Sequence, residues 1–455
     1  MKTFDKEHSA WQRFSTEQRQ EVENYATNYR AFLDTARTER LANKEILRQA
    51  TKAGFRSIQE YTSLQPGDKV FWDQKGKAVV LAIIGKQPLE AGLKIVGSHI
   101  DCPRLDLKGM PLVEKDNIAY FKTHYYGGIL KYQWVCMPLA LLGVVYTASG
   151  KRIDVSIGDE PQDPVLYITD LLPHLGKDQI TKPLGEAITG EMLMPIIGIH
   201  SDEDTVKPAI LQLLKEKYNI EEEDFTTAEL EIVPAQKSRD VGLDRSMIMS
   251  HGQDDRVCSY ANLAAILHAH STEKTQVALF ADKEEIGSMG NTGVQASYFL
   301  DFISELLALQ GHKEELYLRR LLRQSEVLSA DVCAALDPNF ESAFEKNNAG
   351  RFGYGIALCK YTGSRGKAGS SDANAEFLIK IRNIFNENNV PWQISELGKV
   401  DQGGGGTIAY IMANWGCDVV DCGVAMLSMH APLELVAKVD AYCAYLAYKA
   451  FFESL

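Results

Sequence analysis

The chain has 455 residues, a formal net charge of −13 and 45% apolar residues, an ordinary composition for a globular protein. This length exceeds one compact core, so we expect two domains. The acidic balance argues against nucleic acid or an anionic membrane as the main partner, and the longest apolar stretch, residues 135–146, is too short to span a bilayer. Eight cysteines without a dense framework indicate reduced thiols and a cytoplasmic location.

The first part of the chain predicts helices followed by strands. Residues 8–53 have a polar-faced helical pattern, and apolar runs that predict strands come next. Residues 108–245 differ in pattern, with short strands and no sustained alternation of helix and strand. We therefore expect a mostly β domain at residues 108–245, inserted into a catalytic domain made of residues 1–107 and 246–455.

Regular alternation returns after the insert. The apolar runs 277–280, 326–330 and 418–424 predict buried strands, and residues 298–309 predict a long helix. Strands alternating with helices imply an α/β fold, with a mixed, mostly parallel sheet covered by helices on both faces. In such sheets a site forms at the carboxyl ends of the strands.

Two imidazoles and three carboxylates follow strand-like runs or end them. They are His99, Asp254, Glu285, Asp331 and His430. If one sheet holds those strands, these side chains converge. The mixture suits zinc, with cobalt or manganese as alternatives, and a bridging carboxylate would hold two ions about 3.5–4 Å apart. Taken alone, Asp254 with Asp255 suits a helix cap, so the prediction of a metal centre rests on the combination.

Two neighbours of these residues suit supporting roles. Asp101 lies two residues after His99, so the two side chains share a face of an extended segment. Asp101 can then accept a hydrogen bond from the second ring nitrogen of His99. Glu284 and Glu285 are adjacent at the end of a strand, so one carboxylate can bind a metal while the other acts as a general base.

These motifs resemble those of the aspartyl aminopeptidase and vacuolar aminopeptidase I family, metallopeptidase family 18. The resemblance covers nearly the whole chain and rests on five motifs in the family's order: His99-Ile100-Asp101, Asp254-Asp255, Glu284-Glu285-Ile286-Gly287, Asp331 ahead of Pro338-Asn339-Phe340, and Met429-His430. It implies a zinc-peptidase fold, two metals bridged by Asp254, and Glu284 as the base. Asp337 is the alternative to Asp331, but Asp331 ends a strand run and Asp337 suits a turn before proline.

The resemblance also implies an assembly. The inserted domain would be the dimerisation domain, and the chain would form a homo-oligomer, a tetrahedral dodecamer. His200, at the end of residues 194–200, would enter the active site of a neighbouring subunit and contact substrate. The alternative for His200 is a surface histidine at the end of a strand.

Two departures from the family concern substrate binding. Relatives that cleave N-terminal Asp or Glu use a lysine on a strand in this region, and the alignment allows Cys359 or Lys360 there. A slip of one residue turns a strand side chain to the other face, so both remain open. The loop at residues 401–407, which includes Gly404, is rich in glycine and would let backbone approach a bound peptide; a flexible surface loop is the alternative.

The sequence therefore predicts a cytoplasmic metalloaminopeptidase that hydrolyses the N-terminal residue of peptides with two divalent ions. Alternative interpretations with the same fold are a TET-type aminopeptidase, a binuclear amide deacylase and a non-catalytic assembly protein. Free amino acids from peptides, or acetate from acylated substrates, distinguish the peptidases from the deacylase. A degenerate set of ligands would favour the assembly protein, but every ligand position carries a competent side chain.

Overall fold

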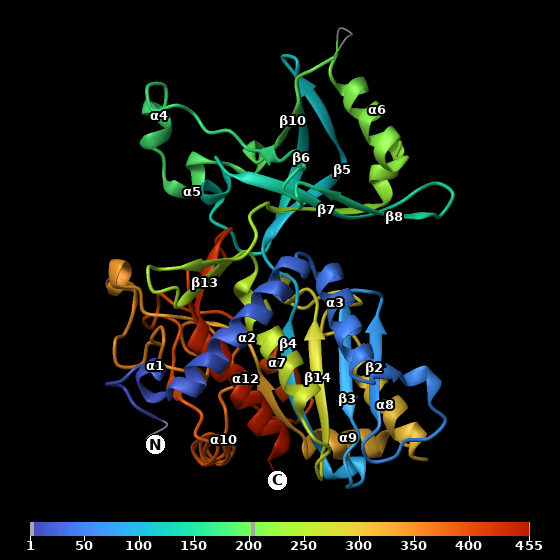
Figure 1. Ribbon diagram of the computed structural model, residues 1–455, viewed down its shortest axis with the longest axis vertical. Coiled ribbons are helices and arrows are strands. Elements are labelled where there is room, and N and C mark those ends of the chain that lie inside the picture. Colours follow the sequence, from blue (N-terminus) through green and yellow to red (C-terminus); the bar gives the residue numbers. More distant parts are fainter. Residues whose placement is uncertain (1–3, 202–204, 455) are drawn as a thin grey trace. The chain divides into compact units, whose positions relative to one another are not determined.

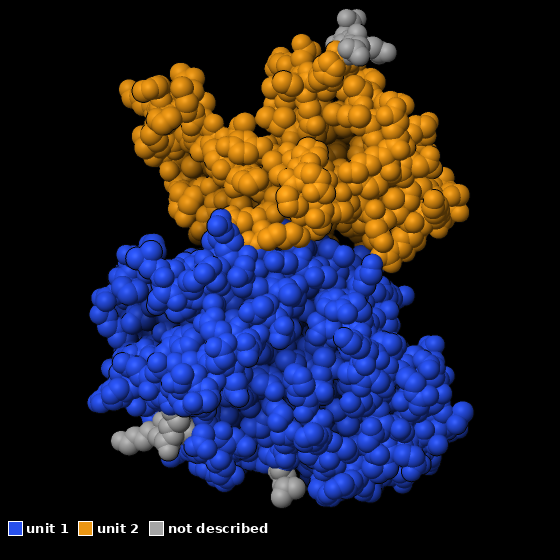
Figure 2. All heavy atoms as spheres, viewed as in Figure 1, with its two compact units in different colours: residues 1–101, 238–429, 434–455 blue, residues 102–237, 430–433 orange. Residues whose placement is uncertain are grey.

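The computed structural model describes residues 4–201 and 205–454. It divides into two compact units, which we call the catalytic unit (residues 1–101, 238–429 and 434–455) and the inserted unit (residues 102–237 and 430–433). Figure 2 shows them in different colours. The inserted unit begins and ends earlier than residues 108–245. The reason is that β5 (Arg104–Lys115) pairs with strands of the inserted unit, whereas β12 (Arg239–Val241) pairs within the catalytic unit.

A nine-stranded sheet forms the centre of the catalytic unit. In spatial order its strands are β1 (Arg56–Ser57), β2 (Lys69–Gln74), β3 (Ala78–Ile83), β14 (Thr275–Ala281), β4 (Leu93–His99), β15 (Glu326–Ser329), β19 (Asp418–Gly423), β17 (Ile356–Cys359) and β18 (Trp392–Ile394). The central strands β14, β4, β15 and β19 are parallel, and β3 and β17 run antiparallel beside them. The mixed, mostly parallel sheet is thus confirmed.

Helices cover both faces of this sheet (Figure 1). Alternate residues of β3 point into different cores: Val79 and Leu81 pack in one, Val80 and Ala82 in the other. The first core receives α2 (Thr16–Thr35), α3 (Glu39–Lys52), α7 (Gln253–His268), α10 (Ala375–Glu387) and α12 (Lys438–Glu453). The second receives α8 (Tyr298–Leu309), α9 (Glu315–Arg323) and α11 (Ala409–Asn414). Because both faces are covered, β3, β14 and β4 are buried along their whole length.

A smaller five-stranded sheet completes the catalytic unit. Its order is β12, β13 (Met247–Ser250), β21 (Glu434–Ala437), β20 (Ala425–Leu427) and β16 (Cys333–Ala334). β13 leads directly into α7, and β16 follows β15. The sheet therefore holds the chain just before Asp254, which lies on α7, and just after Asp331, which follows β15.

The inserted unit is a β-rich structure of its own. Its sheet has the order β11 (Ala228–Pro234), β5, β6 (Ile118–Tyr126), β10 (Ile196–Gly198), β9 (Leu166–Tyr167), β7 (Pro138–Tyr146) and β8 (Arg152–Ile157). β11 also pairs with β7, so six of these strands close into a ring. α6 (Lys207–Tyr218) packs on its core through Leu214. Across the described residues of both units, every helix is too short or too polar to cross a bilayer.

Candidate metal centre

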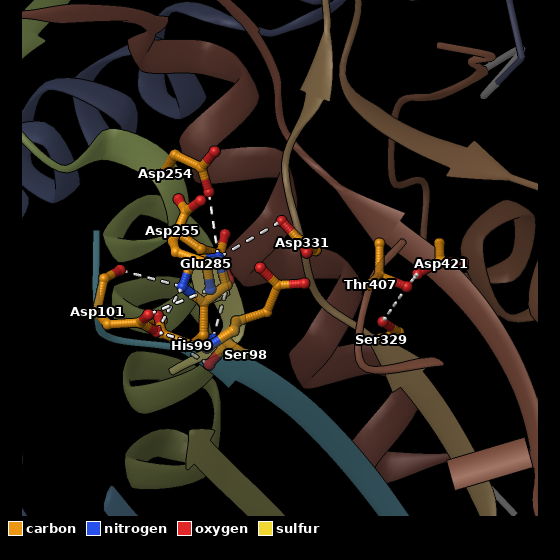
Figure 3. Close-up of polar contacts among 12 residues, drawn as sticks. Ser98, His99, Asp101, Asp254, Asp255, Glu285, Ser329, Asp331, Thr407 and Asp421 are labelled. Carbon is orange, nitrogen blue, oxygen red and sulfur yellow. Dashed lines mark hydrogen bonds and ion pairs between the residues drawn. The ribbon is translucent and has the colours of Figure 1, made fainter. Parts of the chain in front are cut away.

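The candidate site lies at the carboxyl ends of the central parallel strands (Figure 3). His99 is the last residue of β4, and Asp331 follows β15 by two residues. Glu284 and Glu285 lie in the short helix η6 (Glu284–Ile286), which follows β14. Asp254 comes from the first turn of α7. Parallel strands end at one edge of a sheet, and this is why residues far apart in sequence meet here.

His99 is the centre of this cluster. Its Nε2 atom lies 3.1 Å from Oδ1 of Asp254 and 3.8 Å from Oδ1 of Asp331. Its Nδ1 atom lies 3.1 Å from the carbonyl oxygen of Asp101 and 3.3 Å from Oδ1 of the same residue. One ring nitrogen therefore faces the carboxylates that would share a metal, and the other is held by Asp101.

Asp101 also organises the loop that carries the two glutamates. Its Oδ1 accepts a hydrogen bond from the backbone N–H of Glu284 at 3.1 Å, and its Oδ2 accepts one from Glu285 at 3.2 Å. The loop is tight, because Lys283 and Gly287 both have positive φ angles, 65° and 88°. A single buried carboxylate thus links the imidazole to both glutamates, a connection that the sequence did not predict.

The ligand atoms form two groups that share His99. One group is His99, Glu284 and Asp331, and the other is His99, Asp254 and Glu285; within each group the atoms lie within 4.8 Å of one another. An imidazole with carboxylates is a donor set that zinc accepts, so the residues present fit a divalent metal. Because both glutamates offer a ligand atom, the assignment of Glu284 as base and Glu285 as ligand stays a prediction.

The electrostatics of the cluster also favour a cation. Burial raises the pKa of Glu284 and of Glu285 well above the usual value, and the neighbouring carboxylates Asp331 and Asp254 raise them further. Burial alone would lower the pKa of His99, but its hydrogen bonds to the surrounding carboxylates outweigh this and hold that pKa well above its usual value. Several carboxylates crowd this partly buried site, and a divalent ion would offset their repulsion.

The N-terminus of α7 is held by residues that sequence reasoning did not assign. Glu434, on β21, accepts a hydrogen bond from the backbone N–H of Asp254 at 3.2 Å. Asp255, joined to Asp254 by a cis peptide bond, accepts one from the backbone N–H of His99 at 3.3 Å. Tyr29, on α2, donates a hydrogen bond to the side chain of Gln253. Local sequence carries no signal for Glu434, because its contact depends on long-range pairing of β21 with β13.

Four predicted site residues are not members of these two ligand groups. His430 belongs to the inserted unit, where its Nδ1 lies 2.8 Å from the carbonyl oxygen of Gly128. His200, also in that unit, is exposed two residues beyond β10. Lys360 is exposed just after β17, whereas Cys359 is buried in a small core with Cys333. The roles of His430, His200 and Lys360 stay predictions.

Gly404, the fourth, has a structural reason to be glycine. Its φ angle is +154°, and a Cβ atom there would lie 2.6 Å from Cβ of Ser364. The close packing of two loops thus explains this glycine without a ligand.

A sheet of this kind, with candidate imidazole and carboxylate ligands at its carboxyl edge, is typical of a metal-dependent hydrolase. Residues 32–452 match the model of the family described as aminopeptidase I zinc metalloprotease (M18). The probable M18 family aminopeptidase 1 of Clostridium acetobutylicum is 46% identical over 452 residues, which are 97% of each chain. That of Thermotoga maritima is 45% identical over 442 residues, 96% of this chain and 97% of its own. The chain belongs to the M18 family of aminopeptidases and is a metal-dependent peptidase.

Solved structures agree with this assignment. The M18 family aminopeptidase of Thermotoga maritima superposes with a TM-score of 0.95 at 44% identity, covering 98% of this chain and 99% of its own. Aminopeptidase I of Clostridium acetobutylicum gives 0.93 at 44% identity, covering 99% and 100%. The mApe1 dodecamer of yeast, at 18% identity, a TM-score of 0.75 and 94% and 96% coverage, shares the fold.

Proposed function

We propose that this aminopeptidase removes the N-terminal residue of peptides with two divalent ions, zinc by preference. The observation that supports a metal centre is the group of carboxylates around His99. We infer a second ion because the five ligands assigned below exceed the four of one tetrahedral zinc site. We assign the ligands as His99, Asp254, Glu285, Asp331 and His430. Asp254 would bridge the ions, as the family resemblance implies, and its Oδ1 lies 3.1 Å from Nε2 of His99.

The bound ions would polarise the scissile carbonyl and the attacking water. Glu284 takes a proton from that water and delivers it to the leaving amine. Asp101 keeps the base in position, since it fixes the backbone N–H of Glu284 and the ring of His99 at once. Burial of His99 and Asp254 keeps bulk water from screening these charges.

A panel of peptides that differ only in the first residue tests this function. We expect the purified protein to release the first amino acid, to lose this activity on chelation, and to regain it with zinc, cobalt or manganese. Release of acetate from acylated amines, without release of amino acids from peptides, would support the deacylase instead. A metal-loaded protein that is inactive on all of these substrates would contradict both.

The same panel tests the substrate-binding roles of Lys360 and Gly404. We propose that Lys360, exposed beyond β17, receives an acidic first side chain, and that the loop around Gly404 lies along the peptide. An acidic preference that disappears in Lys360→Gln would support this role for Lys360. A preference for apolar first residues would point to the buried, neutral Cys359 instead.

We propose that the chain assembles through its inserted unit into a dodecamer, the state described for yeast mApe1. This unit exposes large apolar side chains, among them Leu175, Ile180 and Ile199, with 67%, 76% and 69% exposure. Apolar groups exposed to this degree favour burial against another subunit.

We further propose that the enzyme works in the cytoplasm, because all eight cysteines are free thiols. Cell fractionation and light scattering test these two statements.

Mixing two inactive variants tests whether His200 acts on a neighbouring subunit. If His200 stabilises the oxyanion in another subunit, then His200→Ala and Glu284→Gln chains co-assembled in one oligomer should regain part of the activity. Each mixed pair of subunits would contain one intact site. Confirmed hetero-oligomers without recovery would remove His200 from the mechanism. His174→Ala, an exposed histidine of the same unit, is the control.

A further inference from the structure

A second polar network lies next to the candidate metal centre and joins Ser329 of β15 and Asp421 of β19 to Thr407 (Figure 3). The hydroxyl of Thr407 donates a hydrogen bond to Oδ1 of Asp421 at 2.6 Å, and Asp421 is 3% exposed. The same hydroxyl oxygen lies 3.5 Å from Oγ of Ser329. Ser329 is the last residue of β15, and Asp331 follows it by two residues, about 7 Å in extended chain. The network is therefore two residues along the chain from a proposed metal ligand.

Thr407 stands at a structural junction. The glycine-rich segment 403–406 ends there and α11 begins two residues later. The Thr407 hydroxyl also accepts a hydrogen bond from the backbone N–H of Ala409 at 3.2 Å. The hydroxyl of Thr407 therefore links the end of the loop to the sheet, through Asp421, and to the following helix, through Ala409.

The first two glycines of this segment are required by packing within the chain. A Cβ atom at Gly403 would lie 1.6 Å from the carbonyl oxygen of Leu397, and Gly404 contacts Ser364 as described above. Gly405 accepts a hydrogen bond from the backbone N–H of Gly363 at 2.6 Å. The segment is therefore held against a second loop, residues 361–369, as well as against the sheet.

The last two glycines have no such requirement among the described residues. Neither Gly405 nor Gly406 has a positive φ angle. A Cβ atom at Gly405 would make an ordinary contact of 3.5 Å with Leu397, and one at Gly406 would meet no described atom within 4 Å. Both residues are exposed. Bare backbone without an internal cause is expected where a bound molecule approaches the chain closely.

From these observations we infer that Thr407 and Asp421 are positioning residues of the aminopeptidase, which hold Gly405 and Gly406 beside the metal centre as a backbone surface for the substrate peptide. This rests on the proposed function of the same site. Burial raises the pKa of Asp421 to about 7, and the hydroxyls of Thr407 and Ser329 oppose that rise. Each partner of the network thus stabilises the other around the buried carboxylate of Asp421.

Thr407→Val tests the inference, because valine keeps the shape and removes the hydroxyl. We expect KM for peptides to rise about tenfold, because a loop without this hydrogen bond keeps its binding conformation in a smaller fraction of molecules. We expect little change in kcat or metal content. Proteolytic cleavage within residues 398–406 should become faster. Thr407→Ser should restore wild-type KM. Thr272→Val is the matched control, because its hydroxyl bonds a backbone carbonyl before β14, at the other end of that strand from the site.

Gly406→Ala tests the same backbone surface without removing the hydrogen bonds of Thr407. The structure has room for the methyl group, so the denaturation midpoint should not fall, while KM should rise several-fold. Gly109→Ala is the control, since Gly109 is also exposed, lacks a positive φ angle and has no described atom within 4 Å of a Cβ. If the wild type is active and KM is unchanged in both Thr407→Val and Gly406→Ala, the inference is wrong but the proposed function stands. A wild type that releases no amino acid would instead overturn the proposed function.

Discussion

Glu284→Gln is expected to lower kcat by about 10²–10⁴-fold, the usual effect of removing a general acid–base. Glutamine keeps the size and the hydrogen-bonding oxygen of the side chain but cannot accept the proton of the attacking water. The backbone N–H of residue 284 still reaches Asp101, so the loop should keep its shape. The measurement is kcat together with the metal content of the purified variant, and Glu315→Gln, on an exposed helix face, is the control.

Glu285→Gln separates the two glutamates, because the structure gives each of them a ligand atom near His99. If Glu284 is the base and Glu285 a ligand, Glu284→Gln keeps its metal and loses turnover, whereas Glu285→Gln loses metal affinity first. Added zinc should then rescue Glu285→Gln in part and leave Glu284→Gln inactive. The opposite pattern would exchange the two roles, and near-normal turnover by Glu284→Gln would remove it from the mechanism.

Glu326→Gln is expected to destabilise the fold by about 3–5 kcal/mol, the range for removing one partner of a buried ion pair. Glu326 lies at the start of β15 and accepts from Lys94 at 2.7 Å, Lys380 at 2.9 Å and Lys274 at 3.3 Å. Lys94 is fully buried, so it would lose its counter-charge without gaining water. Urea unfolding of the metal-free protein measures the change. Lys380→Gln, at a partly exposed position, should change stability by less than about 1 kcal/mol.

The pH dependence of this effect has a definite sign. Burial alone would raise the pKa of Glu326, but the three lysines hold it at about 2, below the ordinary value of 4.5. A carboxylate with a lowered pKa stabilises the folded state above its unfolded value, and this contribution is lost as the pH falls from 4.5 toward 2. The difference between wild type and Glu326→Gln should therefore shrink over that interval. A constant difference would show that the ion pair is not its source.

The sequence predicted the parts of the site that depend on strand ends. His99, Asp331 and the Glu284-Glu285 pair follow buried apolar runs, and parallel strands bring such positions to one edge. The second role of Asp101 was not predictable, because its bonds to the N–H groups of both glutamates depend on the turn at Lys283. No periodic pattern in the sequence indicates these bonds of Asp101.

Long-range pairing accounts for what else the sequence missed. Residues 238–245 were assigned to the insert because residues 108–245 lack a regular alternation of helix and strand. In the structure β13 pairs with β21, which lies far along the chain, and this pairing brings Glu434 to the backbone of Asp254. The network of Thr407 and Asp421 likewise joins a glycine-rich loop to a buried strand. A local pattern cannot specify which distant partner a short strand or a single hydroxyl will meet.

The most direct test of a two-metal aminopeptidase is a zinc titration of the chelated protein, with bound metal and release of the first amino acid measured in the same samples. We predict two ions per chain, activity that is complete only at the second equivalent, and fewer than two ions in Asp254→Ala. Full activity at one equivalent, or two bound ions without release of an amino acid, would contradict this account.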